Sequence, residues 1–338
     1  MNWRAVLLIG TTLFPASVVC AATPMSYLQT FGPAGDPATR LGWGLGIVSI
    51  AVTLIIAVLL LGAIFRKRKV ISKNETSLAV SRDAGGMAWI YIGEGITIVV
   101  LSLCMIWTLV VIARIAQPPS KPVLTVQVTA SQWWWKLRYD AKAPSRIFIA
   151  ANEIHIPVGE PVRFELNSSD VIHSFWIPKL GGKTDVIPGQ TNVTWLQADK
   201  PGVYRGECAV FCGAEHARMA LLVVAQEPKD FRSWQEAQIE DSKAPATAAA
   251  QAGQQVVESQ CAACHTIRGT SAAGLVGPDL THLMSRYTLA AGALPNTTGN
   301  LAGWIMHPQS IKPGSQMPDQ TLSGQQLANV VAYLQTLH

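Results

Sequence analysis

Four residues that bind soft metals lie within one twelve-residue segment of the chain. They are Cys208, Cys212, His216 and Met219, and His173 lies upstream in the run Val-Ile-His-Ser-Phe-Trp. Thiolate and thioether ligands select soft metals such as copper, and imidazole also suits copper. The two cysteines could instead form a disulfide in an oxidising compartment or half of a zinc site, although zinc has little use for a thioether. The complete set favours copper.

A second chemical signature is the sequence C-x-x-C-H, formed by Cys261, Cys264 and His265. This spacing lets both thiols form thioether bonds to a haem, with the histidine as the proximal iron ligand. The other axial ligand has to come from downstream. We predict Met317, on the proline-flanked loop Lys-Pro-Gly-Ser-Gln-Met-Pro. The competing candidates are Met284, Met306, His282 and His307.

The haem signature lies in a segment with helical features. Ser323 and Gln326 form a predicted capping box at the start of a helix. Its apolar residues fall on one face: Leu327, Val330, Val331 and Leu334. We therefore predict a helix that begins after Ser323. Residues 227–250 are predicted as a polar helix followed by an alanine-rich, low-complexity linker.

The copper ligands lie in a segment with the period-two alternation of β-strands. Apolar and polar side chains alternate at residues 124–129 and 162–166, and Pro-Gly turns separate such runs. The pattern predicts an antiparallel sandwich or barrel over residues 118–226. His155, in another alternating run, is predicted to be an exposed strand residue and not a ligand.

Three apolar segments precede this domain. Residues 1–22 have the layout of a secretory signal peptide, and Cys20 leaves lipidation open. Residues 41–65 and 89–113 are each long enough to span a bilayer as a helix. The loop between them, residues 66–88, begins with Arg-Lys-Arg-Lys, and basic loops stay cytoplasmic. Everything after the second span is therefore predicted to be periplasmic or extracellular.

Glu94 is the single charged residue inside the second apolar segment. Ionisable groups are costly in lipid and usually face protein or water. One interpretation is a carboxylate that reaches the cytoplasmic interface, and the other is a group at which protons are taken up.

The composition agrees with a membrane protein. The chain has 338 residues, of which 14% are charged and 49% hydrophobic, with a mean hydropathy of +0.26. Soluble domains carry about 25% charged residues, so a single cytosolic globule is excluded. Most of the net charge of +5 lies in the loop after the first span, and the rest of the chain is almost neutral. A basic face for nucleic acid is therefore not expected.

With these motifs in place, the chain resembles subunit II of the haem-copper cytochrome oxidases over nearly all of residues 41–225. The resemblance includes Gln-Trp-Trp-Trp at residues 132–135, Asp-Val-Ile-His-Ser-Phe-Trp at 170–176, Gly-Lys-Thr-Asp-Val-Ile-Pro-Gly at 182–189, and the cysteine loop. In that family the loop and the upstream histidine bind a dinuclear copper centre, CuA, in a Greek-key cupredoxin fold.

The resemblance implies a role for each copper ligand. Cys208 and Cys212 would bridge both copper ions. His173 and Met219 would complete one copper, and His216 with the backbone carbonyl of Val210 would complete the other. The family commonly has Glu at the position of Val210, where the side chain helps to hold magnesium against subunit I. A carbonyl ligand tolerates valine, so copper is still expected and the magnesium site is doubtful.

The resemblance also assigns one member of the tryptophan run. Side chains alternate faces along a strand, so three consecutive tryptophans cannot all point inward. By resemblance Trp133 is the ring through which electrons reach CuA, although packing within a strand is the alternative. In the same family, a glutamate of subunit II near the position of Glu94 often lies at the mouth of a proton channel in subunit I.

The C-terminal segment resembles class I cytochromes c, including the loop Gly-Pro-Asp-Leu at residues 277–280. This resemblance implies an all-α domain over residues 251–338. Its fusion to subunit II is typical of caa-type oxidases, which are bacterial inner-membrane enzymes. The resemblance implies electron transfer from cytochrome c or another donor, through haem c and CuA, to subunit I, with subunit III as a further partner. Oxygen reduction and proton translocation belong to subunit I.

A copper chaperone would explain the copper ligands but not the haem motif. Subunit II of quinol oxidases shares the membrane topology but lacks the copper ligands. Nitrous-oxide reductases also carry CuA, but they need a large His-rich domain that this sequence does not show.

Overall fold

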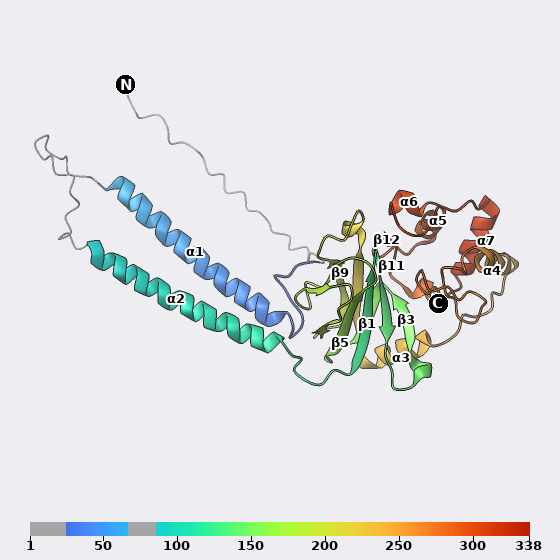
Figure 1. Cartoon of the computed structure of the whole chain (residues 1–338), viewed down its shortest axis with the longest axis horizontal. Helices are drawn as coiled ribbons and strands as arrows, with labels where there is room; N and C mark the ends of the chain where they lie inside the picture. The colour runs from blue at the N-terminus through green and yellow to red at the C-terminus, as the bar shows by residue number, and fades with distance from the viewer. Residues whose placement is uncertain (1–24, 67–85) are drawn as a thin grey trace, which may run out of the picture.

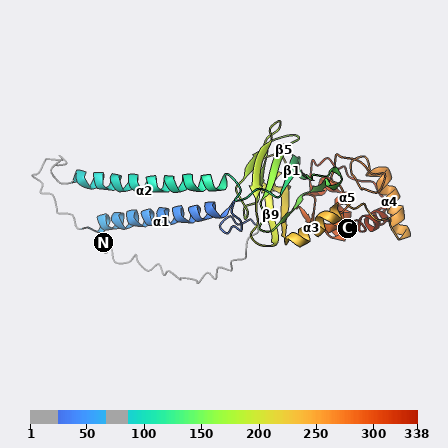
Figure 2. The same ribbon diagram turned by 90° about the horizontal axis from the view of Figure 1, so that it is seen from below.

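The computed structural model describes residues 25–66 and 86–338, which form three successive parts (Figure 1). Two long helices lead into a β-sandwich, and a mainly helical domain follows. The helical hairpin extends from one side of the sandwich, and the C-terminal helices lie on the opposite side (Figures 1 and 2). The predicted signal peptide, with Cys20, and most of the predicted cytoplasmic loop lie outside the described residues.

The hairpin consists of α1 (Asp36–Phe65) and α2 (Gly86–Ile115). Their apolar windows have mean hydropathies of 3.0 and 2.7, and almost none of their side chains are buried within the chain. A core helix of a soluble protein buries an apolar face, whereas these two are apolar all round and long enough to span a membrane. Gly44 lets them approach, because a Cβ there would lie 2.3 Å from the Trp107 ring.

Hydrogen bonds attach the hairpin to the sandwich. The Trp195 indole N–H donates to the Ile115 carbonyl at the end of α2, at 3.0 Å. Before α1, the Phe31 N–H donates to the Lys179 carbonyl, and the Phe31 carbonyl accepts from the Asp199 N–H, both at 2.8 Å. These bonds set the position of the sandwich relative to the hairpin.

The sandwich has two five-stranded sheets. The first has the order β3 (Phe148–Ala151), β2 (Trp134–Tyr139), β1 (Leu124–Ser131), β5 (Val162–Ser168), β8 (Asn192–Leu196). The second has the order β4 (Glu153–Pro157), β10 (Ala220–Gln226), β9 (Gly202–Cys208), β6 (His173–Trp176), β7 (Thr184–Val186). Buried and half-exposed residues alternate along β2, as the period-two pattern predicts, with Trp135 fully buried. The predicted β-sandwich is therefore confirmed.

Two strand pairs depart from the predicted antiparallel arrangement. Strand β1 pairs with β5 in parallel, and β4 pairs with β10 in parallel. Between the members of each pair the chain crosses to the opposite sheet and back. Alternation reports which side of a strand is buried and carries no information about strand direction.

The prediction that His155 is exposed is also wrong. All five residues of β4 are buried, and His155 is 7% exposed. Helix α3 (Pro228–Gln238) covers this strand, and the Trp234 ring stacks on the imidazole at 4.0 Å between centroids. Burial lowers the pKa of His155 to about 4, against the opposing hydrogen bond with Gln226. Trp234 lies 79 residues downstream of His155, so the residue pattern of β4 does not indicate that a helix covers this strand.

The C-terminal domain is built on α4 (Ala248–Gln260), α5 (Thr298–Met306), α6 (Pro308–Ile311) and α7 (Gly324–Leu334), with the short strands β11 (Thr288–Leu289) and β12 (Leu294–Pro295). Gly253 allows α4 to touch α7, because a Cβ there would lie 1.9 Å from the Asn329 carbonyl oxygen. The predicted capping box at Ser323 is present. The predicted linker is partly helical, because α4 begins within it: Thr247 caps a run of alanines, which are the best helix formers.

Candidate metal centre and haem site

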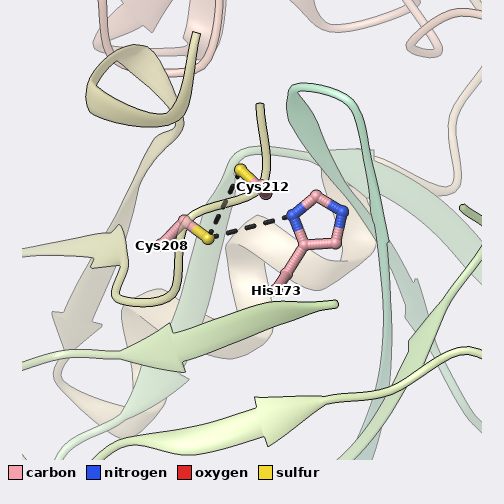
Figure 3. Close-up of side chains that lie close together, drawn as sticks. All are labelled: His173, Cys208 and Cys212. Atoms are coloured by element: carbon pink, nitrogen blue, oxygen red, sulfur yellow. Dashed lines mark hydrogen bonds between the residues drawn. The ribbon is translucent and has the colours of Figure 1, made fainter. Parts of the chain in front are cut away.

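The structure brings all the predicted copper ligands into one cluster. His173 begins β6, Cys208 ends β9, and the others lie on the loop that leads to β10. The Sγ atoms of Cys208 and Cys212 are 3.7 Å apart, and the Nδ1 atom of His173 is 3.8 Å from Cys208 Sγ (Figure 3). These three residues are buried and place their ligand atoms within 4.8 Å of one another. The cluster forms because β6 and β9 are paired neighbours.

The remaining three candidate ligands surround the same sulfur atoms. The Nδ1 atom of His216 and the Sδ atom of Met219 lie 3.6 Å and 3.9 Å from Cys212 Sγ. The Val210 carbonyl oxygen lies 3.2 Å from Cys208 Sγ. Three nitrogen or oxygen donors and three sulfur atoms therefore converge on one small volume.

This donor set fits copper better than the two alternatives. A disulfide needs its sulfurs about 2.05 Å apart, and Cys208 and Cys212 are free thiols in the structure. A structural zinc site closes with four cysteine or histidine ligands. A buried thioether at Met219, 0% exposed, is a ligand suited to soft copper.

The two thiols share a hydrogen bond that separates their acidities. The hydrogen bond shared with Cys212 lowers the pKa of Cys208, and the His173 imidazole adds to this shift. The pKa of Cys212 is raised by the same shared bond and by burial, and because a second thiolate would form close to the first. Both thiols must lose their protons to bind metal, so metal loading is expected to release protons.

Asp170 orients one ligand and was not singled out from the sequence. Its Oδ1 atom lies 2.8 Å from the Nε2 atom of His173, which directs the Nδ1 atom towards Cys208. Burial alone would lower the pKa of His173, but its hydrogen bonds to Cys208 and Asp170 raise it. A carboxylate partner on the outer nitrogen is the usual support of a metal-binding histidine. The three-residue separation between Asp170 and His173 was the available signal.

Trp133 lies directly against the cysteine loop. Its indole N–H donates to the Cys212 carbonyl at 3.2 Å, and the side-chain amide of Gln132 donates to the same oxygen at 2.7 Å. Gly213 makes this approach possible, because a Cβ there would lie 2.8 Å from Gln132 and 3.1 Å from Trp133. The Gly213 φ angle of +125° also favours glycine. The tryptophan ring is therefore held next to the copper cluster.

The four predicted haem residues line one cavity in the C-terminal domain. Its wall contains Cys261, Cys264, His265 and Met317, with apolar side chains from α5 and α7. The Nδ1 atom of His265 lies 2.8 Å from the Pro278 carbonyl oxygen, which accepts a hydrogen bond from it and leaves Nε2 free to bind iron. The predicted loop at residues 277–280 supplies this carbonyl. The cavity, the thiols and the oriented imidazole together fit a haem.

The rival ligands are less well placed than Met317. His282, His307, Met284 and Met306 do not line the cavity. His282 uses one ring nitrogen on the His338 carbonyl at 2.8 Å and the other on Arg268 at 3.0 Å. The Met317 loop is held by Gln309, whose amide donates to the Met317 carbonyl at 2.7 Å. Sequence reasoning did not identify Gln309.

The haem cavity and the copper cluster share a wall. The cavity is lined on the sandwich side by Gln132, Trp133, Trp134 and Asn152. Trp133 therefore touches both sites, and it is 8% exposed because the C-terminal domain covers it. Glu94 lies within α2 and joins neither site.

Comparisons with known proteins agree with this division. Residues 141–226 match the family model of the cytochrome c oxidase subunit II periplasmic domain, and residues 250–338 match that of cytochrome c. Cytochrome c oxidase subunit 2 of Alkalihalophilus pseudofirmus is 41% identical over 214 residues, which cover 63% of this chain and 60% of the relative. This alignment spans less than two thirds of that relative. Cytochrome c oxidase subunit 2 of Bacillus sp. strain PS3 is 28% identical, covering 99% of this chain and 98% of the relative.

Among solved structures, the periplasmic domain of subunit II of the cytochrome oxidase of Bradyrhizobium japonicum is 34% identical. The match covers 35% of this chain and 95% of that chain, with a TM-score of 0.33.

Proposed function

We propose that the chain belongs to the cytochrome c oxidase subunit II family, in the form that carries a cytochrome c domain, and that it is the electron-transfer subunit of a terminal respiratory oxidase. Electrons pass from an external donor, cytochrome c or another exported or membrane-bound carrier, through haem c to CuA and on to subunit I. Subunit I reduces oxygen to water and translocates protons. The hairpin anchors the chain in the bacterial inner membrane beside subunits I and III, with both cofactor domains outside the cytoplasm.

The residues of the copper cluster divide into ligands and supports. Cys208 and Cys212 would hold a pair of copper ions between them. His173, Met219, His216 and the backbone carbonyl of Val210 would supply the remaining ligands. When bound, such a copper pair and a haem each accept and release one electron at a time. The Val210 side chain has no oxygen atom, so we propose no magnesium ligand at this position.

The residues of the haem cavity fix the second cofactor covalently and axially. Cys261 and Cys264 would hold it through thioether bonds, and His265 and Met317 would bind its iron. The hydrogen bond from His265 to the Pro278 carbonyl keeps the ring in one tautomer.

One observation carries the proposal: Trp133 connects the two sites. Its ring lines the haem cavity while its N–H donates to the Cys212 carbonyl. An aromatic ring in this position shortens the gap that an electron has to cross.

Trp133→Ala is therefore expected to slow electron transfer from haem c to CuA while both copper ions stay bound. Flash-induced absorbance changes of the oxidase complex measure the rate, and electron paramagnetic resonance reports the copper pair. Loss of the ring destabilises the sandwich by about 3–5 kcal/mol. Trp234→Ala is a matched control, since Trp234 packs between α3 and β4, away from both sites. Equal transfer rates in the two variants would reduce Trp133 to a packing residue and remove the main support for the proposal.

Met317→Leu is expected to keep the covalent haem but to lower its reduction potential, because a methionine axial ligand raises the potential. A fall beyond about 59 mV corresponds to more than a tenfold change in the one-electron equilibrium. Redox titration of the purified chain measures it. Met306→Leu is the control, because Met306 lies outside the cavity. An unchanged potential in Met317→Leu, with a change in Met306→Leu, would transfer the ligand role to Met306.

Glu94→Gln tests whether α2 takes part in proton uptake. The change removes the carboxylate at nearly constant volume. We expect slower turnover at saturating donor, with CuA and haem c more reduced in the steady state, because proton delivery to subunit I would limit the rate of oxygen reduction. Oxygen consumption and absorbance measure the two quantities. Unaltered turnover between pH 6 and pH 9 would leave Glu94 as an interfacial anchor.

A further inference from the structure

A buried lysine joins the haem domain to the copper domain. Lys312 is 3% exposed, and its Nζ atom donates to three backbone carbonyls. These belong to Trp133 at 2.6 Å, Arg218 at 2.8 Å and Ala290 at 3.1 Å. Trp133 and Arg218 lie in the copper domain, and Arg218 directly precedes the ligand Met219. Ala290 lies in the haem domain, so one amine holds three segments together.

Neighbouring contacts place the same loop on the copper domain. The Arg218 guanidinium donates to the Ile311 carbonyl at 2.6 Å. Gly314, with a φ angle of +81°, packs against Trp133, and a Cβ there would lie 3.3 Å from the ring. Lys312 and Gly314 both precede Met317 on this loop. The loop that carries the distal haem residue is therefore the one that covers Trp133.

The chemistry of this contact requires a lysine. A charged amine has three N–H donors, and the structure supplies one carbonyl for each. Burial lowers the pKa of Lys312 to about 7, and the Glu215 carboxylate opposes that shift. A charged group is buried in a protein only where such partners compensate for the lost water.

We propose that Lys312 is a positioning residue for electron transfer between the two centres. It holds the Met317 loop against Trp133, so that the haem site and the copper site keep one separation. This inference rests on the proposed function, which supplies the two centres.

The test is Lys312→Met in the oxidase complex, measured at pH 6, where the unaltered amine is charged. We expect the rate of transfer from haem c to CuA to fall about tenfold or more, because charge-assisted hydrogen bonds between the domains are lost. The haem spectrum and the copper resonance should stay unchanged. Lys243→Met is the matched control, since Lys243 is exposed and has no side-chain hydrogen bond among the described residues. A normal rate in Lys312→Met with both signals intact would overturn the proposal.

A second measurement on the unaltered complex covers the case in which Lys312→Met fails to fold. Amine acetylation at pH 8 is followed by mass spectrometry at Lys312 and Lys243. A low pKa makes an accessible amine react faster, so slow labelling of Lys312 would report burial. We expect labelling about tenfold slower or more than at Lys243, as local opening limits access. Equal labelling would overturn the inference. Failure of the proposed function looks different: the unaltered complex, with both centres loaded, would show no transfer from haem c to CuA.

Discussion

Cys208→Ser and Cys212→Ser are each expected to remove both copper ions from the chain while the haem stays attached. In the proposed assignment each thiolate would bind both metals, so one substitution would take a ligand from each of them. The two sulfurs are 3.7 Å apart and share their neighbours, so no other thiol among the described residues can take over. Serine keeps the size of the side chain but supplies a hard oxygen, which suits copper poorly.

Copper content per chain, electron paramagnetic resonance and the haem absorption spectrum check this result together. Cys104→Ser is a control for loss of a cysteine as such, because Cys104 lies in α2, away from the cluster. Two copper ions per chain in either bridging variant would contradict the ligand assignment. Loss of the haem as well would mean that the two domains fold as one unit.

The second large effect is expected for Cys261→Ala combined with Cys264→Ala. The double variant should release all of its haem on denaturation, since both thioether bonds are gone. Without haem, the apolar cavity between α4, α5 and α7 loses its filling, so the C-terminal domain is also expected to unfold at lower temperature.

Haem staining of a denaturing gel and thermal unfolding of the purified chain measure these outcomes. Each single variant keeps one thioether bond and should retain haem on the gel, which makes the single variants internal controls. Haem that stays with the denatured double variant would refute covalent attachment at these cysteines. The copper content should not change, because the proposed copper ligands lie in the sandwich.

Spacing along the sequence indicates which side chains lie together where the site is local. The loop from Cys208 to Met219 carries four of the proposed ligands in one stretch, and the structure clusters them. His173 is 35 residues upstream, and only the pairing of β6 with β9 brings it to Cys208. The family resemblance, and not the spacing, made that residue predictable. The cysteine–histidine motif of the haem site is local in the same way.

Residues that depend on distant packing were missed. Lys312 and Trp133 are 179 residues apart in the sequence, and no local pattern predicts their contact. Gln309 holds the Met317 loop by donating hydrogen bonds to backbone carbonyls. Every residue has a backbone carbonyl, so the sequence does not show which ones Gln309 contacts. In a sandwich of two sheets, the alternating pattern around His155 predicts that its side chain faces solvent. Helix α3 packs on that face as a third layer and buries it. Local patterns predicted the elements, while the contacts between elements required the structure.

The most direct test of the central claim is the order in which the two centres are reduced. The oxidase complex is mixed anaerobically with reduced cytochrome c, and absorbance is followed separately for haem c and CuA. The account predicts that haem c is reduced first and CuA follows, and that Cys208→Ser stops the electrons at haem c. Reduction of CuA before haem c, or at an unchanged rate in the chain that lacks Cys261 and Cys264, would contradict the account.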